Sequence, residues 1–520
     1  MSKALLRSGM IVSAMTLVSR VLGLARDVVI ANLMGAGASA DVFFFANRIP
    51  NFLRRLFAEG AFNQAFVPVM TEYKQTKSFK DTQDLLAAVS GTLGLIVTVV
   101  TLAGMVGSGV VTALFGAGWF MEWLQGGPEA HKFELASLLL KITFPYLWFI
   151  CFTAMAGAIL NTFGKFAVSS FTPVFLNVCI IAAAWWLSPR LAQPEIGLAV
   201  GVFAGGLVQF LFQFPFLARL KLLVRPRWAW HHPGVVKIRT LMIPALFGVS
   251  VSQVNLLFDT MLASFLATGS ISYLYYSDRL LEFPLGLFGI AIATVILPAL
   301  SSRHVDDAHD GFAATMDWGV RMVLLMGFPA MLGLIVLSEP MLRVLFMRGE
   351  FGMEEVAAAG KSLVAYGLGL QAFMLIKVLA PGYYARQDTR TPVRFGIIAM
   401  VANMVFNAVL IFPLGYVGLA LATAMSGMLN AGLLGWGLYQ RAVYRPSRTT
   451  LIFTGQVAAA GAGMAALLWW LSPPLTVWAG WELGQSGLHL LGYIGAGALC
   501  YGALLLLLGV RPRHFRAVEA

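Results

Sequence analysis

The sequence predicts an all-α polytopic membrane protein with about fourteen transmembrane helices, arranged as two pseudo-symmetric six-helix lobes followed by two C-terminal helices. Three observations favour this class. Hydrophobic residues make up 59% of the 520 residues and charged residues only 12%, whereas about a quarter of an ordinary soluble chain is charged. Apolar runs of roughly the 20 residues that a membrane-spanning helix needs recur from end to end. Basic residues gather in alternate connections between these runs.

The spans follow from apolar runs of membrane-crossing length. They are predicted at residues 9–35, 39–71, 83–115, 135–163, 167–189, 195–219, 238–267, 271–301, 315–339, 356–384, 393–413, 417–440, 449–472 and 488–510. An even number of crossings puts both termini on one side of the membrane, and basic residues indicate the cytoplasmic side. Only Lys132, Arg190, Arg343 and Arg348 fall in connections on the side opposite the termini. Both termini are therefore expected in the cytoplasm.

The net charge of +12 is explained by this topology and does not indicate nucleic-acid binding. The segment 219–239 mixes basic residues with two tryptophans, which leaves two interpretations. It could bind nucleic acid, or it could be an amphipathic cytoplasmic linker lying on the anionic inner leaflet. The second interpretation is favoured, so the expected neighbours are membrane lipids.

Several classes of function are disfavoured by what the sequence lacks. The predicted connections are too short for a soluble catalytic domain, and no G-x-x-x-x-G-K-[ST] motif is present to bind a nucleotide. The three cysteines, Cys151, Cys179 and Cys500, all lie in apolar runs, so no disulfide framework is expected. The seven histidines have no metal-ligand spacing. We expect no required cofactor.

The chain contains a weak internal repeat, in which residues 26–69 resemble residues 258–299. Asp27 aligns with Asp259, Arg48 lies near Arg279, and the pair 56–57 (Leu-Phe) lies near the pair 287–288 (Leu-Phe). The two copies enter the membrane in the same direction, as parallel repeats do in transporters. The predicted domains are an N-terminal lobe at 1–220, a C-terminal lobe at 221–440 and two further helices within 441–520.

Charged residues inside the predicted spans are the main functional signal, because each costs ~2.5–3.5 kcal/mol on insertion scales. They fall on the equivalent helices of the two repeats. With their polar neighbours, the first helix carries Ser19, Arg20, Arg26 and Asp27; the second carries Asp41, Arg48, Asn51, Arg54, Arg55 and Glu59; the eighth carries Asp278, Arg279 and Glu282. We expect them to line or gate a water-filled cationic cavity between the lobes.

Arginine in such a cavity favours an anionic guest, since its planar fork of donors matches phosphate oxygens. A diphosphate is the expected group. The alternative is that each arginine pairs with its neighbouring carboxylate and only braces the helices. The pairs concerned are Arg26–Asp27, Arg55–Glu59 and Arg279–Glu282.

Four stretches carry a resemblance to a known family: SRVLGLARD (19–27), ADVFFFANRIPNFLRRLFAEGAFNQAFVPV (40–69), YYSDRLLEFP (275–284) and KVLAPGYYARQDTRTPV (377–393). They closely resemble the MurJ (MviN) family of bacterial lipid II flippases, in the multidrug/oligosaccharidyl-lipid/polysaccharide exporter superfamily. The resemblance runs from about residue 5 to the last helix.

The resemblance implies a pair of six-helix lobes in the bacterial inner membrane that work by alternating access. The cargo would be lipid II, the undecaprenyl-diphosphate-linked disaccharide-pentapeptide used in peptidoglycan synthesis, and cell-wall synthesis proteins would be candidate partners. The family's cavity arginines fall by motif on Arg20, Arg26, Arg54 and Arg279, with Asp41 as an acidic partner near the outer gate. The two C-terminal helices would form a groove for the polyprenyl tail.

Two interpretations stay open for a second set of polar residues, one of which is a sodium site, since some members of the family bind sodium in the C-terminal lobe. Hard oxygen ligands could come from Asp259, Asn403, Asn407 and Thr423. Asp259 is the only formal charge in this set. A hydrogen-bonded aspartate with packing amides is the alternative interpretation.

Two other functions remain in contest with a flippase. An ion-coupled exporter of drugs or of another polyprenyl-linked glycan shares the fold, but a drug exporter favours an apolar or acidic cavity over four arginines. A membrane enzyme acting on a lipid-diphosphate substrate is more remote, since it needs carboxylates at the membrane face and usually larger loops.

Overall fold

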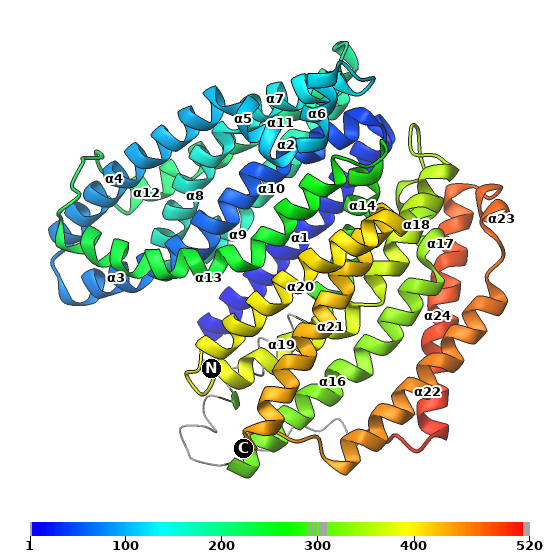
Figure 1. Cartoon of the computed structure of the whole chain (residues 1–520). Helices are drawn as coiled ribbons and strands as arrows, with labels where there is room; N and C mark the ends of the chain where they lie inside the picture. The colour runs from blue at the N-terminus through cyan, green and yellow to red at the C-terminus, as the bar shows by residue number, and fades with distance from the viewer. Residues whose placement is uncertain (1–2, 290–291, 293–295, 297–298, 301–308, 513–520) are drawn as a thin grey trace. The chain divides into compact units, whose positions relative to one another are not determined.

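The structure is a computed structural model that describes residues 3–289, 292, 296, 299–300 and 309–512; the side chains of residues 3–10, 58–60, 252 and 309 are not described. All regular secondary structure in these residues is helical, which confirms the predicted class (Figure 1). The chain forms two compact units, Met1–Ser272 and Tyr273–Ala520. Packing defines these units, whereas the repeat defines the predicted lobes. The lobe boundaries near 220 and 440 therefore stay a prediction.

The first unit is built from long helices interrupted by short turns. Its elements are α1 (Lys3–Met34), α2 (Ala38–Arg54), η1 (Arg55–Ala61), α3 (Phe62–Thr76), α4 (Phe79–Val106), α5 (Ser108–Phe115), α6 (Ala117–Gln125), α7 (Ala130–Thr143), α8 (Pro145–Thr162), α9 (Phe166–Phe171), α10 (Pro173–Ala182), η2 (Ala183–Leu187), η3 (Ser188–Arg190), α11 (Pro194–Phe212), α12 (Phe214–Arg219) and α13 (Pro233–Ala263). Pro145 and Pro173 start α8 and α10, where a proline loses no helical hydrogen bond.

The second unit contains the remaining helices, except that the first residues of α14 belong to the first unit. Its elements are α14 (Ser270–Pro284), η4 (Leu285–Gly289), α16 (His309–Val336), α17 (Ser338–Phe346), α18 (Met353–Gly367), α19 (Leu370–Tyr384), α20 (Arg390–Leu414), α21 (Tyr416–Gln440), α22 (Arg448–Leu471), α23 (Leu475–Ala479) and α24 (Leu483–Leu507). Part of its core is aromatic, since the buried Tyr276 ring contacts Phe346 and Phe351.

Eleven helices among the described residues are long and apolar enough to cross a membrane. They coincide with eleven of the fourteen predicted segments. The other three, 9–35, 39–71 and 271–301, are almost wholly helical where they are described, but they are the segments that carry the charged residues expected in the cavity or at its gate. The total of fourteen spans and the cytoplasmic termini stay predictions.

Both repeats contain a π-helical turn at aligned positions. In the first repeat α2 continues into the π-helix η1, which contains Leu56 and Phe57. In the second repeat α14 continues into the π-helix η4, which contains Leu287 and Phe288. These are the Leu-Phe pairs that the sequence aligns. Since π-turns are rare and often mark functional sites, their recurrence supports the internal repeat.

The linker after α12 lies against α4. The Arg227 amide donates to the Ala87 carbonyl at 3.0 Å, and the Ala229 amide donates to Thr92 Oγ1 at 3.1 Å. Gly91 permits this close approach, because a Cβ there would lie 2.0 Å from the Arg227 carbonyl oxygen. The Trp228 side chain stays 54% exposed and stacks on Trp230. That the linker lies on the membrane surface stays a prediction.

A buried carboxylate fastens the connection between α21 and α22. Asp317 of α16 is 9% exposed and accepts hydrogen bonds from Tyr444 Oη (2.9 Å), Ser447 N (3.2 Å), Ser447 Oγ (2.7 Å) and Thr450 Oγ1 (2.7 Å). Helices α22 and α24 then pack along α16 and against each other (Figure 1). The two C-terminal helices are thus integrated into the second unit.

Candidate functional site

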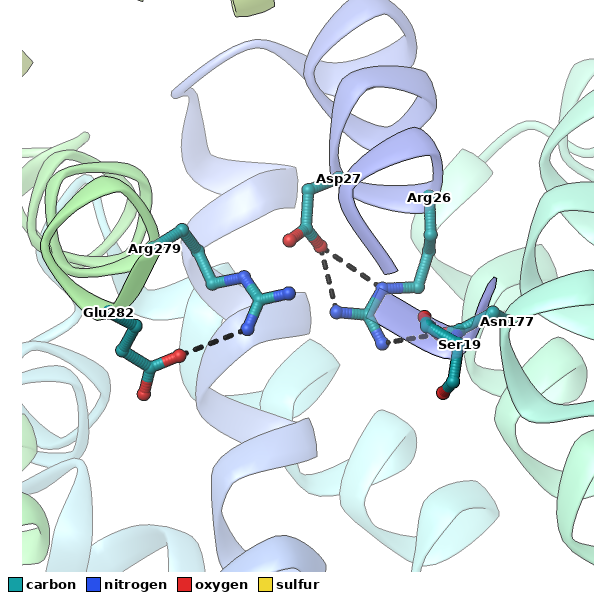
Figure 2. Close-up of polar contacts among 6 residues, drawn as sticks. All are labelled: Ser19, Arg26, Asp27, Asn177, Arg279 and Glu282. Atoms are coloured by element: carbon teal, nitrogen blue, oxygen red, sulfur yellow. Dashed lines mark hydrogen bonds and ion pairs between the residues drawn. The ribbon is translucent and has the colours of Figure 1, made fainter. Parts of the chain in front are cut away.

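Arg26 lies at the centre of a polar network in the first unit. Its Nε and Nη2 atoms donate to Asp27 Oδ1 at 3.0 and 2.9 Å, and its Nη1 donates to Asn177 Oδ1 at 3.0 Å (Figure 2). Asn177, from α10, in turn donates to the Ser19 carbonyl of α1 at 3.2 Å. The Asp27 side chain is fully buried and that of Arg26 is 15% exposed. The network therefore fixes the arginine against two helices.

The end of α2 carries a second ordered arginine. Asn51 Nδ2 donates to the Asn47 carbonyl at 2.8 Å, and Asn51 Oδ1 accepts from Arg54 Nε at 3.2 Å. This chain of bonds runs along one helix face, as the spacing of residues 47, 51 and 54 predicts. Arg55, the next residue, is exposed.

Arg26 and Arg54 line one cavity, which lies wholly within the first unit. Its volume is about 710 Å³ and its walls come from α1, the end of α2, α3, α8, α9, α10 and α11. The lining is rich in amide and hydroxyl groups and includes Lys74 of α3 as a third basic residue. Cavities of ~300–1,000 Å³ hold drug-sized ligands. The arrangement can bind an anion that carries further polar groups.

Asp41 caps the start of α14. Its carboxylate is buried and accepts from Gly269 N at 2.7 Å, from Ser272 N at 2.9 Å and from Ser272 Oγ at 2.6 Å. The first amides of a helix have no partner within the helix, and a carboxylate there is favoured by the helix dipole. Asp41 therefore ties α2 to the beginning of α14. Its role at an outer gate stays a prediction.

The second unit carries an arginine–carboxylate pair of a different kind. Arg279 Nη1 lies 3.1 Å from Glu282 Oε2, one turn along α14 (Figure 2). Both side chains are partly exposed, at 30% and 44%. Asp278 lies beside them and is partly buried.

Two of the three local pairs that offered a bracing role are thus formed, Arg26–Asp27 and Arg279–Glu282. The third, Arg55–Glu59, involves a side chain outside the described residues. Pairing does not separate the two interpretations at Arg26, because the same side chain also lines the cavity. Arg20 is exposed and does not line this cavity, so its predicted role rests on the sequence alone.

The expected sodium ligands fall in different units. Asp259, on α13, belongs to the first, whereas Asn403, Asn407 and Thr423 belong to the second. The two asparagines are buried on α20, which packs against α21. Thr423 Oγ1 donates to the Leu419 carbonyl of its own helix at 3.1 Å. Whether the four residues bind one ion stays a prediction.

The amide side chains of the cavity were missed by reasoning from the sequence. Asn177 holds Arg26, and Asn63, Gln209 and Gln213 line the same space. The signal that could have found them is an uncharged amide within an otherwise apolar span, which costs free energy to bury unless it finds a partner. The predicted site was based on charged residues within the spans, and most of these lie on α1, α2 and α14.

Comparisons with known proteins agree with one another. A family model described as "Lipid II flippase MurJ" matches residues 30–484. A "Probable lipid II flippase MurJ" from Vibrio cholerae serotype O1 is 69% identical, covering 99% of this chain and 98% of that protein. The "Lipid II flippase MurJ" of Burkholderia cenocepacia is 38% identical, covering 98% of this chain and 99% of that protein.

Solved structures give the same picture of the fold. A structure titled "Lipid II flippase MurJ, inward closed conformation" matches with a TM-score of 0.80 and 27% identity, covering 96% of this chain and 98% of that chain. An inward-facing multidrug resistance MATE family transporter matches with a TM-score of 0.69 at 13% identity, covering 85% of this chain and 99% of that chain. The second likeness concerns the fold alone.

Proposed function

The chain belongs to the MurJ family of lipid II flippases, and on that premise we propose that Arg26 and Arg54 bind the diphosphate of its cargo. As a member of the family it is a multi-pass protein of the bacterial inner membrane. It moves lipid II, the undecaprenyl-diphosphate-linked peptidoglycan precursor, from the inner to the outer leaflet. Arg20 and Arg279 join the proposed set by motif.

The observation that carries this proposal is the cavity of the first unit, which two arginines and a lysine line together. Charged side chains are costly on a helix face that is exposed to the lipid hydrocarbon. In a cavity, the same side chains can form charge-assisted hydrogen bonds with a diphosphate. Hydrogen bonds from guanidinium to phosphate are charge-assisted and about twice as strong as neutral ones. Arg26 is also fixed by Asp27 and Asn177, so little side-chain freedom is lost on binding.

The test replaces Arg54, which donates a hydrogen bond to Asn51 of its own helix. We expect Arg54→Ala to weaken diphosphate binding by roughly 10–100-fold, since a hydrogen bond to a charged group is worth ~1.5–3 kcal/mol. Flipping of fluorescent lipid II in proteoliposomes should fall accordingly, while the thermal unfolding midpoint stays near that of the parent.

Arg219→Ala is the matched control, because Arg219 lies in the same unit but is exposed and outside the cavity lining. It should flip lipid II at the parental rate. Parental flipping by Arg54→Ala, or an equal loss in both variants, contradicts a diphosphate site at Arg54.

We further propose that the chain transports its cargo chemically unchanged and does not act as an enzyme. Membership of a flippase family supports this view. We also propose that the chain contacts proteins of cell-wall synthesis.

We also propose a sodium ion bound by Asp259, Asn403, Asn407 and Thr423. Support comes from the two buried asparagines, which are one turn apart on α20. Sodium should raise the thermal unfolding midpoint of the purified protein more than potassium does, and Asp259→Ala should abolish the difference. An equal sodium response in the variant and the parent would exclude Asp259 as a ligand.

A further inference from the structure

Three of the amide side chains that line the cavity of the first unit have a buried oxygen with no donor among the described residues. Asn63 comes from α3, Gln209 from α11, and Gln213 from the residue between α11 and α12. Gln209 is 2% exposed and Gln213 is 1% exposed. Glutamine is rarely buried so completely in an apolar helix unless its polar atoms are used.

Thr172 fixes the orientation of both glutamines. Its hydroxyl donates to the Val168 carbonyl at 2.8 Å, so Oγ1 can serve Gln213 only as an acceptor. Gln213 Nε2 donates to this Oγ1 at 3.2 Å, and Gln209 Nε2 donates to the Thr172 carbonyl at 3.2 Å. A flipped amide would set oxygen against oxygen in both cases. The nitrogens therefore face Thr172, and the oxygens are the groups left for another partner.

These oxygens are acceptors that the described protein groups do not satisfy. Gln209 Oε1, Gln213 Oε1 and Asn63 Oδ1 are all buried, and none has a donor among the residues that the structure describes. Buried carbonyl oxygens are almost always paired in folded proteins. Three such oxygens around one cavity call for a guest that brings N–H or O–H groups.

The charge of the same cavity decides the class of guest. Carbonyl oxygens could coordinate a cation, but Arg26, Arg54 and Lys74 line the same space and disfavour one. An anion would be attracted by the basic residues and repelled by the amide oxygens. A ligand with an anionic end and a neutral, donor-rich end fits both sets of groups.

We propose that Asn63, Gln209 and Gln213 form a subsite for the sugar joined to the cargo's diphosphate. We make this assignment on the premise of the proposed function, which places the phosphates on Arg26 and Arg54. Hydroxyl groups and the N–H of an acetamido sugar supply the donors that the three oxygens lack. The cavity volume of about 710 Å³ leaves room for such a group beside the phosphates.

The experiment compares two ligands on the full chain in lipid nanodiscs. One is a short-chain prenyl diphosphate, and the other is the same molecule with an N-acetylhexosamine on its terminal phosphate. The parent protein should bind the glycosylated ligand about tenfold more tightly, a difference equivalent to ~1.4 kcal/mol. Isothermal titration calorimetry gives both dissociation constants.

Gln213→Met and Asn63→Leu remove an acceptor oxygen with little change in side-chain volume. Each should lower the tenfold preference toward onefold and leave the affinity for the sugar-free diphosphate unchanged. Asn63→Leu also disrupts none of the described hydrogen bonds, so it tests the subsite even if Gln213→Met fails to fold. Arg54→Ala, by contrast, should weaken both ligands.

The matched control is Gln371→Met in the second unit. Gln371 is likewise buried, its Nε2 donates to the Val323 carbonyl at 3.4 Å, and its Oε1 has no donor among the described residues. It should keep the parental preference. Equal affinities of the parent for the two ligands would mean that water satisfies the oxygens and would overturn the subsite. The subsite would also be overturned if Gln213→Met and Asn63→Leu both kept the tenfold preference, or if they lost affinity for the two ligands equally.

Failure of the proposed function has a different signature. In that case Arg54→Ala would bind the sugar-free diphosphate with the parental affinity, whether or not the sugar changes the affinity.

Discussion

Arg26 in the first unit and Arg279 in the second each pair with a nearby carboxylate, at 2.9 and 3.1 Å, yet the two pairs differ in how far they are buried. Asp27 is fully buried, and Arg26 is also bonded to Asn177, 151 residues away on another helix. Arg279 and Glu282 are both partly exposed and lie on one helix. Both ion pairs lie within one helix, but Arg26 also joins α1 to α10 through its bond to Asn177.

The difference teaches that one sequence pattern can serve two purposes. A buried charge whose partner is removed is costly, because it has left water and gained nothing in return. An exposed pair contributes little to stability, with a median of ~0–1 kcal/mol. The first arginine should therefore matter for folding as well as for cargo, and the second mainly for cargo.

The largest effect is expected for Arg26→Ala. This change leaves the buried Asp27 carboxylate without its arginine, and we expect the free energy of unfolding to fall by about 3 kcal/mol. Thermal unfolding in detergent would show it as a lower midpoint. The double variant Arg26→Ala/Asp27→Asn removes the buried charge as well and should recover much of the loss. No recovery would indicate that Arg26 stabilises the unit through packing and its bond to Asn177 and not by neutralising Asp27.

An intermediate effect is expected for Asn177→Leu. The variant loses the bond to Arg26 Nη1 and the bond to the Ser19 carbonyl, which join α10 to α1. We expect a loss of about 2 kcal/mol, within the ~1–3 kcal/mol range for an unsatisfied buried group. Asn161→Leu serves as the control, since this asparagine lines the same cavity but is exposed, and the one hydrogen bond described for its side chain comes from the Ser169 hydroxyl. Equal losses of stability in the two variants would show that the bonds joining α10 to α1 do not add to the free energy of unfolding.

The smallest effect on stability is expected for Arg279→Ala. Removal of the partly exposed pair with Glu282 should change the free energy of unfolding by less than ~1 kcal/mol. Lipid II flipping should nevertheless be lost, because the resemblance assigns this arginine to the cargo site. Glu282→Gln removes the same ion pair but keeps Arg279, so it measures how much of the effect comes from losing the pair. A large fall in the unfolding midpoint of Arg279→Ala would erase the distinction drawn between the two arginines.

The fold could be predicted from the sequence wherever apolar length decides it. Eleven predicted spans are helices of membrane-crossing length and apolarity, because a bilayer leaves a buried backbone few alternatives to a helix. The internal repeat was also visible in the Leu-Phe pairs at 56–57 and 287–288. The π-turns at these positions were not predicted, since such a turn has no residue signature comparable to a cap or a proline.

The site was predicted in part, for a physical reason. Arg26 and Arg54 stand out because a charge in a span is expensive. Asn177 and Gln213 do not, since a single amide can be satisfied locally or by a residue far along the chain. The bond between Arg26 and Asn177 crosses 151 residues, and the orientation of Gln213 depends on the hydroxyl of Thr172, between α9 and α10. Such partners are known only once the helices are packed.

The four donors around Asp317 bear on how the chain can be shortened. The three donor residues, Tyr444, Ser447 and Thr450, lie between the end of α21 and the first turn of α22. Truncation after Arg441 would remove all three residues and leave the buried Asp317 carboxylate without these hydrogen-bond donors. A shortened chain that ends with the twelfth predicted helix would therefore need Asp317 replaced by an apolar residue before it could be expected to fold.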